Sequence, residues 1–349
     1  MVAKHLLVLM ALGSASAILR AEPDYSVFSS IEVVASSEPV PITDMISGWD
    51  GGFQAGEYAY ADARVRFGFE AHGWQLSREQ RWYYYLSFTE QTSRFFNSLE
   101  RSQPVSAGEI DLEAWSFQSY GLNLAKQFQL TDDWDASIGV SVFNIGHYQF
   151  GTLRGFAESG SDRDDLKASA VLDYHYDEDK ILEYEDDDKK GRGYSLSFSV
   201  TGQLTADWQL SIQLDDAWNR LEFTDATFTE GCIEFNDPTN PLCDALSSAS
   251  GRSGVSAYNT SIPSTFRAGV NYLPADLGVE LFRHDEYLRA GLVKGWQTPV
   301  GELGVLGYST RQFGGYWQSG WHQLKIVADD RQAARIRDLD LTLALKLRW

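Results

Sequence analysis

Two cysteines offer the clearest covalent chemistry in this sequence. Cys232 and Cys243 are its only cysteines, and the polar segment between them contains two prolines. In an oxidising compartment, a disulfide between them would close a short ring and stabilise the fold by about 3 kcal/mol. Zinc binding is the alternative, but no histidine lies nearby and two thiolates do not complete a tetrahedral site. If the chain is exported, we therefore predict a disulfide in an exposed loop.

A run of carboxylates offers oxygen ligands for a hard cation. Its members are Asp177, Glu178, Asp179, Glu183, Glu185, Asp186, Asp187 and Asp188. Such ligands suit calcium, or the magnesium that bridges neighbouring lipopolysaccharides. We take Asp186, Asp187 and Asp188 as candidate ligands of a weakly bound divalent cation. The spacing matches no calcium-binding loop, so a solvated acidic loop is the alternative interpretation.

The histidines do not show the spacing of a catalytic pair. A strand places residues i and i+2 on one face, so a serine two positions after a histidine would bring hydroxyl and imidazole together. The residues found there, after the five histidines beyond the N-terminal segment, are Trp74, Gln149, Asp177, Glu286 and Leu324. His284 and Asp285 mimic the Asp-His couple of an outer-membrane protease only loosely. We therefore predict no catalytic residue and no cofactor.

Charged residues recur on the polar side of segments whose other side is apolar. They are Arg64, Arg66, Glu70, Arg81, Asp215, Arg267, Asp338, Asp340, Lys346 and Arg348. If these segments form a barrel, the charges face its lumen as opposed patches, which is how porins select solutes. The alternative is that they pair with one another and fill a narrow barrel.

Strands with one polar and one apolar face must position these charges. Polar and apolar residues alternate along the sequence as such strands require. Apolar residues occupy every second position from Tyr194 to Leu204, between Ser, Thr and Gln, and Trp208 to Asp215 repeats the pattern. Shorter alternating stretches cover residues 63–70, 81–88 and 266–272. A soluble antiparallel sandwich also alternates. The small polar residues and arginines of the polar side are more typical of a hydrated lumen than of a solvent face.

The composition excludes several classes of protein and of binding partner. After the N-terminal segment, no apolar stretch is long enough for a transmembrane helix, and the mean hydropathy is −0.30. The 11 Trp and 17 Tyr favour a membrane barrel, because amphipathic rings gather where a bilayer meets water. The formal charge of −20 argues against nucleic acid as a partner.

The N-terminus has the order of a secretory signal. Lys4 and His5 precede the apolar run Leu6 to Leu12, and small residues end at Ala17. We expect cleavage after residue 17, with residue 21 as a second site, and we expect export through the periplasm. No cysteine follows the run, so no lipid attachment is indicated.

The last strand carries the most specific pattern. Apolar residues occupy every second position from Leu339, and the chain ends on Trp349. This resembles the C-terminal signature of bacterial outer-membrane β-barrel proteins, with Trp where Phe is commoner. The resemblance implies that the barrel assembly machinery reads this exposed edge strand before the barrel closes. The residues that match this assembly signal are Leu343, Leu345, Leu347 and Trp349.

Turns and loops give the expected architecture, an all-β transmembrane antiparallel barrel of about 12 strands, with 10 to 14 allowed. Tight periplasmic turns are predicted at 130–134, 204–208 and 273–276, and long outer loops at 91–108, 151–192 and 224–257. The second loop alternates over 166–176, as a projecting hairpin would. We expect a lead-in or lumen segment at 22–52 and the barrel at 53–349, with the strands between 278 and 326 left unassigned.

We therefore expect an outer-membrane β-barrel that acts as a porin-like passive channel for small polar solutes. The alternatives are a plugged structural or surface barrel with a binding role at its outer loops, a solitary autotransporter-type barrel, and an outer-membrane hydrolase. Expected partners are outer-membrane lipid, lipopolysaccharide and the assembly machinery.

Overall fold

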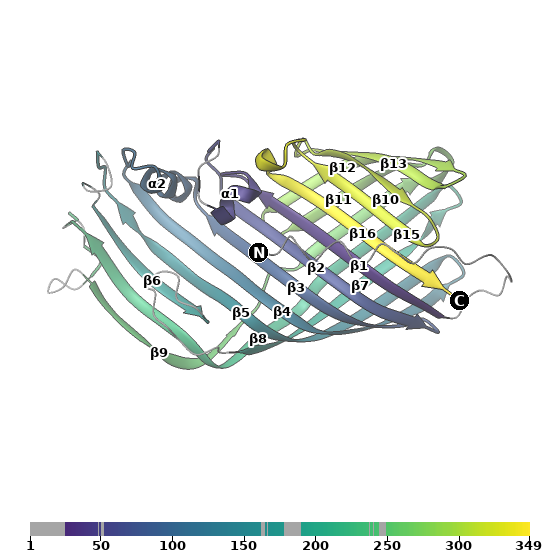
Figure 1. Cartoon of the computed structure of the whole chain (residues 1–349), viewed down its shortest axis with the longest axis horizontal. Coiled ribbons are helices and arrows are strands. Elements are labelled where there is room, and N and C mark those ends of the chain that lie inside the picture. The colour runs from purple at the N-terminus through teal and green to yellow at the C-terminus, as the bar shows by residue number, and fades with distance from the viewer. Residues whose placement is uncertain are drawn as a thin grey trace.

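The computed structural model describes residues 25–47, 49, 52–161, 165, 167–177, 190–236, 238–239, 241–243 and 249–349. Two predictions fall outside these ranges: the secretory signal, and the cation ligands Asp186, Asp187 and Asp188. The described part forms one antiparallel sheet of 16 strands (Figure 1). No helix in it is long and apolar enough to cross a membrane.

The strands follow one another closely along the chain. The first eight are β1 (Tyr25–Ser37), β2 (Tyr58–Ala71), β3 (Trp74–Phe88), β4 (Gly108–Thr131), β5 (Trp134–Ala157), β6 (Ala168–Tyr176), β7 (Gly191–Thr205) and β8 (Trp208–Phe235). The others are β9 (Ala249–Thr260), β10 (Thr265–Tyr272), β11 (Leu277–His284), β12 (Tyr287–Thr298), β13 (Gly301–Tyr308), β14 (Phe313–Gln318), β15 (His322–Ala328) and β16 (Asp338–Arg348).

Fourteen of these strands close into a barrel, and β6 and β9 are additions to it. The prediction of about 12 strands is therefore wrong by two, because the stretch from 278 to 326 holds most of β11, all of β12 to β14 and part of β15. Those strands have 6 to 12 residues, and all but β15 contain glycine, which weakens alternation as a sequence signal.

The expected lead-in before residue 53 is also wrong, because it contains a barrel strand. β1 pairs with β2 on one side and with β16 on the other, from Ser26 opposite Arg348 to Ser36 opposite Asp338. The first and last strands thus close the sheet, and the terminal Trp349 donates its backbone N–H to the carbonyl of Tyr25. Closure removes the free edges that would otherwise invite aggregation.

The two ends of the barrel differ. At one, here called the turn end, the chain reverses in tight turns, including the three predicted at 130–134, 204–208 and 273–276. The other, the loop end, carries the longer connections, with helix α1 (Ile42–Ser47) between β1 and β2 and helix α2 (Glu90–Glu100) between β3 and β4 (Figure 1). Thr89 caps α2 by accepting a hydrogen bond from the Thr92 N–H.

The sheet continues past the barrel at the loop end. β6 pairs with the loop-end half of β5 and with one edge of β8. β9 pairs with the other edge of β8. With β4, these strands form what we call the extension (Figure 1). The predicted disulfide is present there and joins Cys232 to Cys243, whose Cα atoms lie 5.5 Å apart. The expected projecting hairpin at 166–176 is instead the single strand β6.

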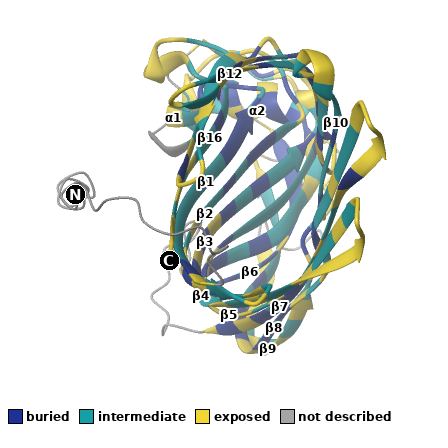
Figure 2. Cartoon of the chain, turned by 90° about the vertical axis from the view of Figure 1, so that its right-hand side faces the viewer, coloured by how far each residue is buried: buried dark blue, intermediate teal, exposed yellow. Residues whose placement is uncertain are grey.

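Alternation along the strands separates an inner from an outer face, and burial alternates with it (Figure 2). Large apolar residues stay exposed on the outside, among them Phe67, Leu122 and Val142, at 64%, 57% and 52% exposure. The residues predicted as the assembly signal also face outward on β16, where Leu347 and Trp349 are 63% and 65% exposed. Such an apolar outer band is what a lipid-facing barrel requires. That the assembly machinery reads this strand stays a prediction.

Candidate functional site

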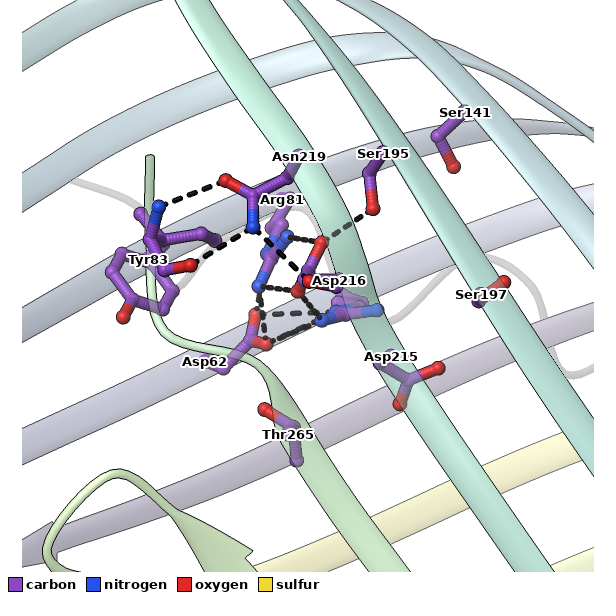
Figure 3. Close-up of polar contacts among 12 residues, drawn as sticks. Asp62, Arg81, Tyr83, Ser141, Ser195, Ser197, Asp215, Asp216, Asn219 and Thr265 are labelled. Carbon is purple, nitrogen blue, oxygen red and sulfur yellow. Dashed lines mark hydrogen bonds and ion pairs between the residues drawn. The ribbon is translucent and has the colours of Figure 1, made fainter. Parts of the chain in front are cut away.

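Four charged side chains from three strands meet inside the barrel and form the feature we call the charged belt. Its members are Asp62 and Arg64 on β2, Arg81 on β3 and Asp216 on β8 (Figure 3). β3 and β8 are separated in the barrel by β4, β5 and β7, so the contacts between them cross the lumen. The belt is therefore a brace across the lumen between two parts of the wall that three strands separate.

Arg81 is the centre of this brace. One edge of its guanidinium donates to Asp62, with Nε–Oδ1 and Nη2–Oδ2 distances of 2.9 Å each. Its other edge donates to Asp216, with distances of 3.1 Å from Nη1 and 2.8 Å from Nη2. A planar guanidinium is suited to such paired bonds, which hold both carboxylates in fixed orientations.

Arg64 closes the belt from the other side. Its Nη2 lies 2.7 Å from Asp62 and 3.1 Å from Asp216, and Ser195 on β7 adds a hydroxyl donor 2.6 Å from Asp216. Side-chain exposure is 11% for Arg64, 3% for Arg81, 8% for Asp62 and 2% for Asp216. Two arginines and two aspartates balance, so the buried cluster has no net charge. Removing one partner would leave another charge buried and unpaired, which is strongly destabilising.

A break in β8 places Asp216 in the belt. Asp216 has φ of 53°, a left-handed conformation that Asp tolerates better than most residues. Along one edge, β8 pairs with β10 as far as Asp215, and pairing on that edge resumes at Leu221, where β9 is the partner. Asn219 spans this gap by donating to the carbonyls of Asp216 and Ile262 and accepting from the Ile262 N–H (Figure 3). In a regular strand Asp216 would face outward. Because of the break, its side chain points into the lumen instead.

Further ion pairs line the inner wall around the belt. Arg66 lies 2.6 Å from Glu79 and 3.2 Å from Glu32, and Arg267 lies 2.6 Å from Asp215. Other pairs join Lys346 to Glu70, Arg289 to Asp340 and Lys325 to Asp340. Both predicted arrangements therefore coexist: the charges face the lumen, and most of them are already paired.

An aromatic layer fills the lumen on the loop-end side of the belt. It consists of Tyr60, Tyr83, Tyr85, Phe117, Phe282, His284 and Tyr287, each buried. Tyr83 and Phe117 stack with ring centroids 5.2 Å apart, and Tyr60 stacks on His284 at 4.1 Å. Such contacts exclude water as well as contributing dispersion energy.

His284 is enclosed within this aromatic layer. Its Nε2 lies 2.9 Å from the Tyr83 hydroxyl and its Nδ1 lies 2.9 Å from the Thr265 hydroxyl. The side chain is fully buried, so no substrate can reach either nitrogen in this structure. Its role here is to connect β11 to β3 and β10 within the layer.

Polar cavities occupy the lumen on the turn-end side. The largest has a volume of 480 Å³ and is lined by hydroxyls and amides, including Thr201, Gln213 and Asn271, together with Arg267 and Lys325. Two more, of 380 and 190 Å³, share Ser137 and Ser199. An apolar pocket of 270 Å³ lies instead on the outer face, beside Trp82 and Tyr84. All three inner cavities are lined by Ser199, and we call them together the vestibule. Arg66 and Asp215, which line the smallest of them, are neighbours of the belt residues Arg64 and Asp216.

The structure brings together five of the residues predicted to line the lumen: Arg64, Arg66, Arg81, Asp215 and Arg267. Glu70 and Lys346 pair nearer the turn end, whereas Asp338 accepts hydrogen bonds from Ser36 and Tyr287 nearer the loop end. Asp340 contacts Arg289 and Lys325. Arg348 is exposed at the last position of β16 and takes no part in the cluster.

Sequence analysis missed the two carboxylates of the belt. Asp62 shares the face of Arg64 and Arg66 on β2, so extending that alternation by one step would have found it. Asp216 adjoins the predicted Asp215 and should face outward in a regular strand. Only the break in β8 turns it inward, and no local sequence signal marks that break.

Comparisons with known proteins give structural neighbours only. No family model matches the chain, and no curated protein does. A mutant of the TodX monoaromatic hydrocarbon channel has 10% identity over 93% of this chain and 90% of its own, with a TM-score of 0.45. The CymD monoaromatic hydrocarbon channel has 8% identity over 93% and 88%, with a TM-score of 0.43. The Pseudomonas putida toluene transporter TodX has 9% identity over 93% and 89%, at 0.41. TM-scores this low assign neither family nor function.

Proposed function

We propose that this protein is an outer-membrane β-barrel that acts as a passive channel for small polar solutes. The turn end would face the periplasm and the loop end the outside. The observation that carries the proposal is the vestibule inside the closed barrel, with its largest cavity of 480 Å³ lined by hydroxyls, amides and charged side chains of both signs. Small barrels are commonly filled by their own side chains, whereas these cavities leave part of the lumen open.

The belt and the aromatic layer together form the constriction of this channel. Tyr85 and His284 have no exposed surface and Arg81 is 2% exposed, so the lumen is closed at this level in the structure. Passage therefore requires the brace to open. Because Arg64 and Arg81 reach Asp216 across the lumen, a shift of the broken segment of β8 would separate the two sides of the belt. Ion-paired side chains at a constriction also give a basis for charge selectivity.

Single-channel recording of the refolded mature protein in planar bilayers tests this proposal. We expect brief, small conductance steps from the wild type. The double variant Arg81→Gln with Asp216→Asn keeps the net charge but removes the brace, and we expect a severalfold larger open fraction. Arg283→Gln is the matched control, because Arg283 is an exposed arginine on the outer face of β11 and should leave conductance unchanged.

Absence of conductance from both the wild type and the double variant, each folded by its heat-modifiable mobility, would contradict the channel. A second candidate function would then be favoured by the extension, which projects beyond the barrel and is covalently tied at Cys232 and Cys243. That candidate is a surface barrel with a binding role at its outer loops. Binding to cell-surface ligands that disappears when residues 224–257 are replaced would support it.

A further inference from the structure

Arg78 occupies an unusual position on the outer face of β3. Alternation along β3 puts Trp74, Leu76, Arg78 and Gln80 on the outside, because Ser77 and Glu79 are buried on the inside. In register with Arg78 lie Phe67 on β2 and Leu122 on β4, which are 64% and 57% exposed. Arg78 therefore lies on the outer face of the barrel, in the middle of the apolar band.

Arg78 is exposed, and within the described residues it has no hydrogen-bond or ion-pair partner. Three other cations of the outer face are anchored to backbone carbonyls near strand ends. These contacts are Lys126 to His72, Arg283 to Asp285 and Lys294 to Ala275. A cation on the lipid face of a barrel costs free energy unless an anion meets it, so an unpaired one in the apolar band indicates a binding partner.

The partner cannot readily be a carboxylate of a second copy. Position by position, the outward-facing residues of the barrel strands include no Asp or Glu, apart from the part of β8 beyond Asp216. There, Glu222 is already paired with Arg220 at 2.7 Å, and the exposed Asp225 lies in the extension, where β8 pairs with β9. The anion that is plentiful beside a membrane barrel is the phosphate of lipid headgroups.

We propose that Arg78 binds the phosphate of an anionic phospholipid from the periplasmic leaflet, with Lys126 as the second cation of the site. Arg78 follows Trp74, the first residue of β3, by four positions, which is roughly 13 Å along the strand. A strand tilted by about 45° brings that to roughly 9 Å in depth. A long arginine side chain covers most of that depth toward the headgroups by extending along the wall.

The register places the second cation on the same stripe. Lys126 is directly opposite Trp74 on β4, and its Nζ lies 5.1 Å from the Trp74 ring centroid. Leu76 and Leu124 form the apolar patch between Lys126 and Arg78. The lysine and tryptophan thus mark the headgroup level, as interfacial residues do. The Arg78 guanidinium approaches from the membrane interior and donates paired hydrogen bonds to phosphate oxygens.

Lipid retention in nanodiscs tests the proposal without relying on conductance. The mature protein is reconstituted in phosphatidylcholine with added phosphatidylglycerol, and lipids that stay bound are counted by native mass spectrometry. We expect the wild type to retain phosphatidylglycerol selectively, and Arg78→Gln to bind it about fivefold more weakly. Lys126→Gln should weaken binding in the same direction, and Arg283→Gln is the control that should not.

A second measurement covers any effect on folding. Added phosphatidylglycerol should raise the thermal midpoint of the wild type and of Arg283→Gln, but not that of Arg78→Leu, which removes the charge and fits the apolar band. Equal phosphatidylglycerol retention by the wild type and Arg78→Gln would overturn the proposal. So would a wild-type dimer, formed without anionic lipid, that Arg78→Gln disperses, since the partner would then be a second copy.

Discussion

Arg81 on β3 and Asp216 on β8 are joined by two hydrogen bonds, of 3.1 and 2.8 Å, that cross the lumen between strands with three others between them. The same guanidinium holds Asp62 on the neighbouring strand, so one side chain ties three strands together. A contact of this kind both closes the passage and fixes the shape of the wall, and the two effects can be separated by mutation.

Asp216→Asn tests the charge balance of the belt. The amide keeps the size of the side chain but leaves two buried arginines with one carboxylate, so we expect a loss of about 3 kcal/mol in the free energy of unfolding. Urea titration of the protein refolded into vesicles measures it. Asp225→Asn, at an exposed position of β8, is the control and should change stability little. An equal loss in both variants would show that the belt is not specifically stabilising.

Tyr83→Ala tests whether the aromatic layer obstructs the lumen. Removing the ring opens space against Phe117 and takes away the hydrogen bond to His284. We expect a larger single-channel conductance and a loss of about 3–5 kcal/mol in stability. Tyr84→Ala is the matched control, because the next residue of β3 faces outward beside the apolar pocket. An increase in conductance with Tyr84→Ala but not Tyr83→Ala would contradict this placement of the constriction.

Asn219→Ala tests the clamp across the break in β8. The change removes three hydrogen bonds, two of which hold the backbone of Ile262. We expect faster hydrogen exchange over residues 261–264 and a larger open fraction of the channel, because the segment that carries Asp216 is less restrained. Asn259→Ala, at an exposed position on β9, should change neither. Unchanged exchange in Asn219→Ala would mean that packing alone holds the gap.

Replacement of Cys232 and Cys243 by serine tests the role of the disulfide. The closed ring lies in the extension, away from the belt, so conductance should be unchanged. Opening it increases the freedom of the loop, and we expect faster cleavage within residues 232–243 by an added protease. Wild-type protein treated with a reductant should behave in the same way. A change in conductance would instead connect the extension to the constriction.

Trp349→Ala tests the predicted assembly signal. The tryptophan ends the closing strand and its N–H bonds to Tyr25, so its backbone contact survives the change while the aromatic ring is lost. We expect less folded protein in the outer membrane of expressing cells, with normal stability of the fraction that folds. Trp321→Ala removes another exposed aromatic near the turn end and is the control. Equal yields of the two variants would argue against a specific signal at the C-terminus.

The sequence by itself determined which residues face inward wherever the strands are regular. Alternation has a period of two in every such strand, so Arg64, Arg66, Arg81 and Arg267 could be assigned to one face without knowing their neighbours. The disulfide was equally accessible, because two cysteines have one possible pairing within a chain. The tight turns followed from local chemistry, which needs no distant contact.

Tertiary structure alone decided what these inward residues contact. The partners of Arg81 lie 19 and 135 positions away in the chain, and no local pattern relates β3 to β8 across a lumen. The strand count depended on short glycine-containing strands, whose pairing partners define them more than their own sequence does. Asp216 shows the limit most clearly: a break in hydrogen bonding between β8 and its neighbours reverses the side that the residue faces. That break is set by how three strands meet, and sequence alternation cannot report it.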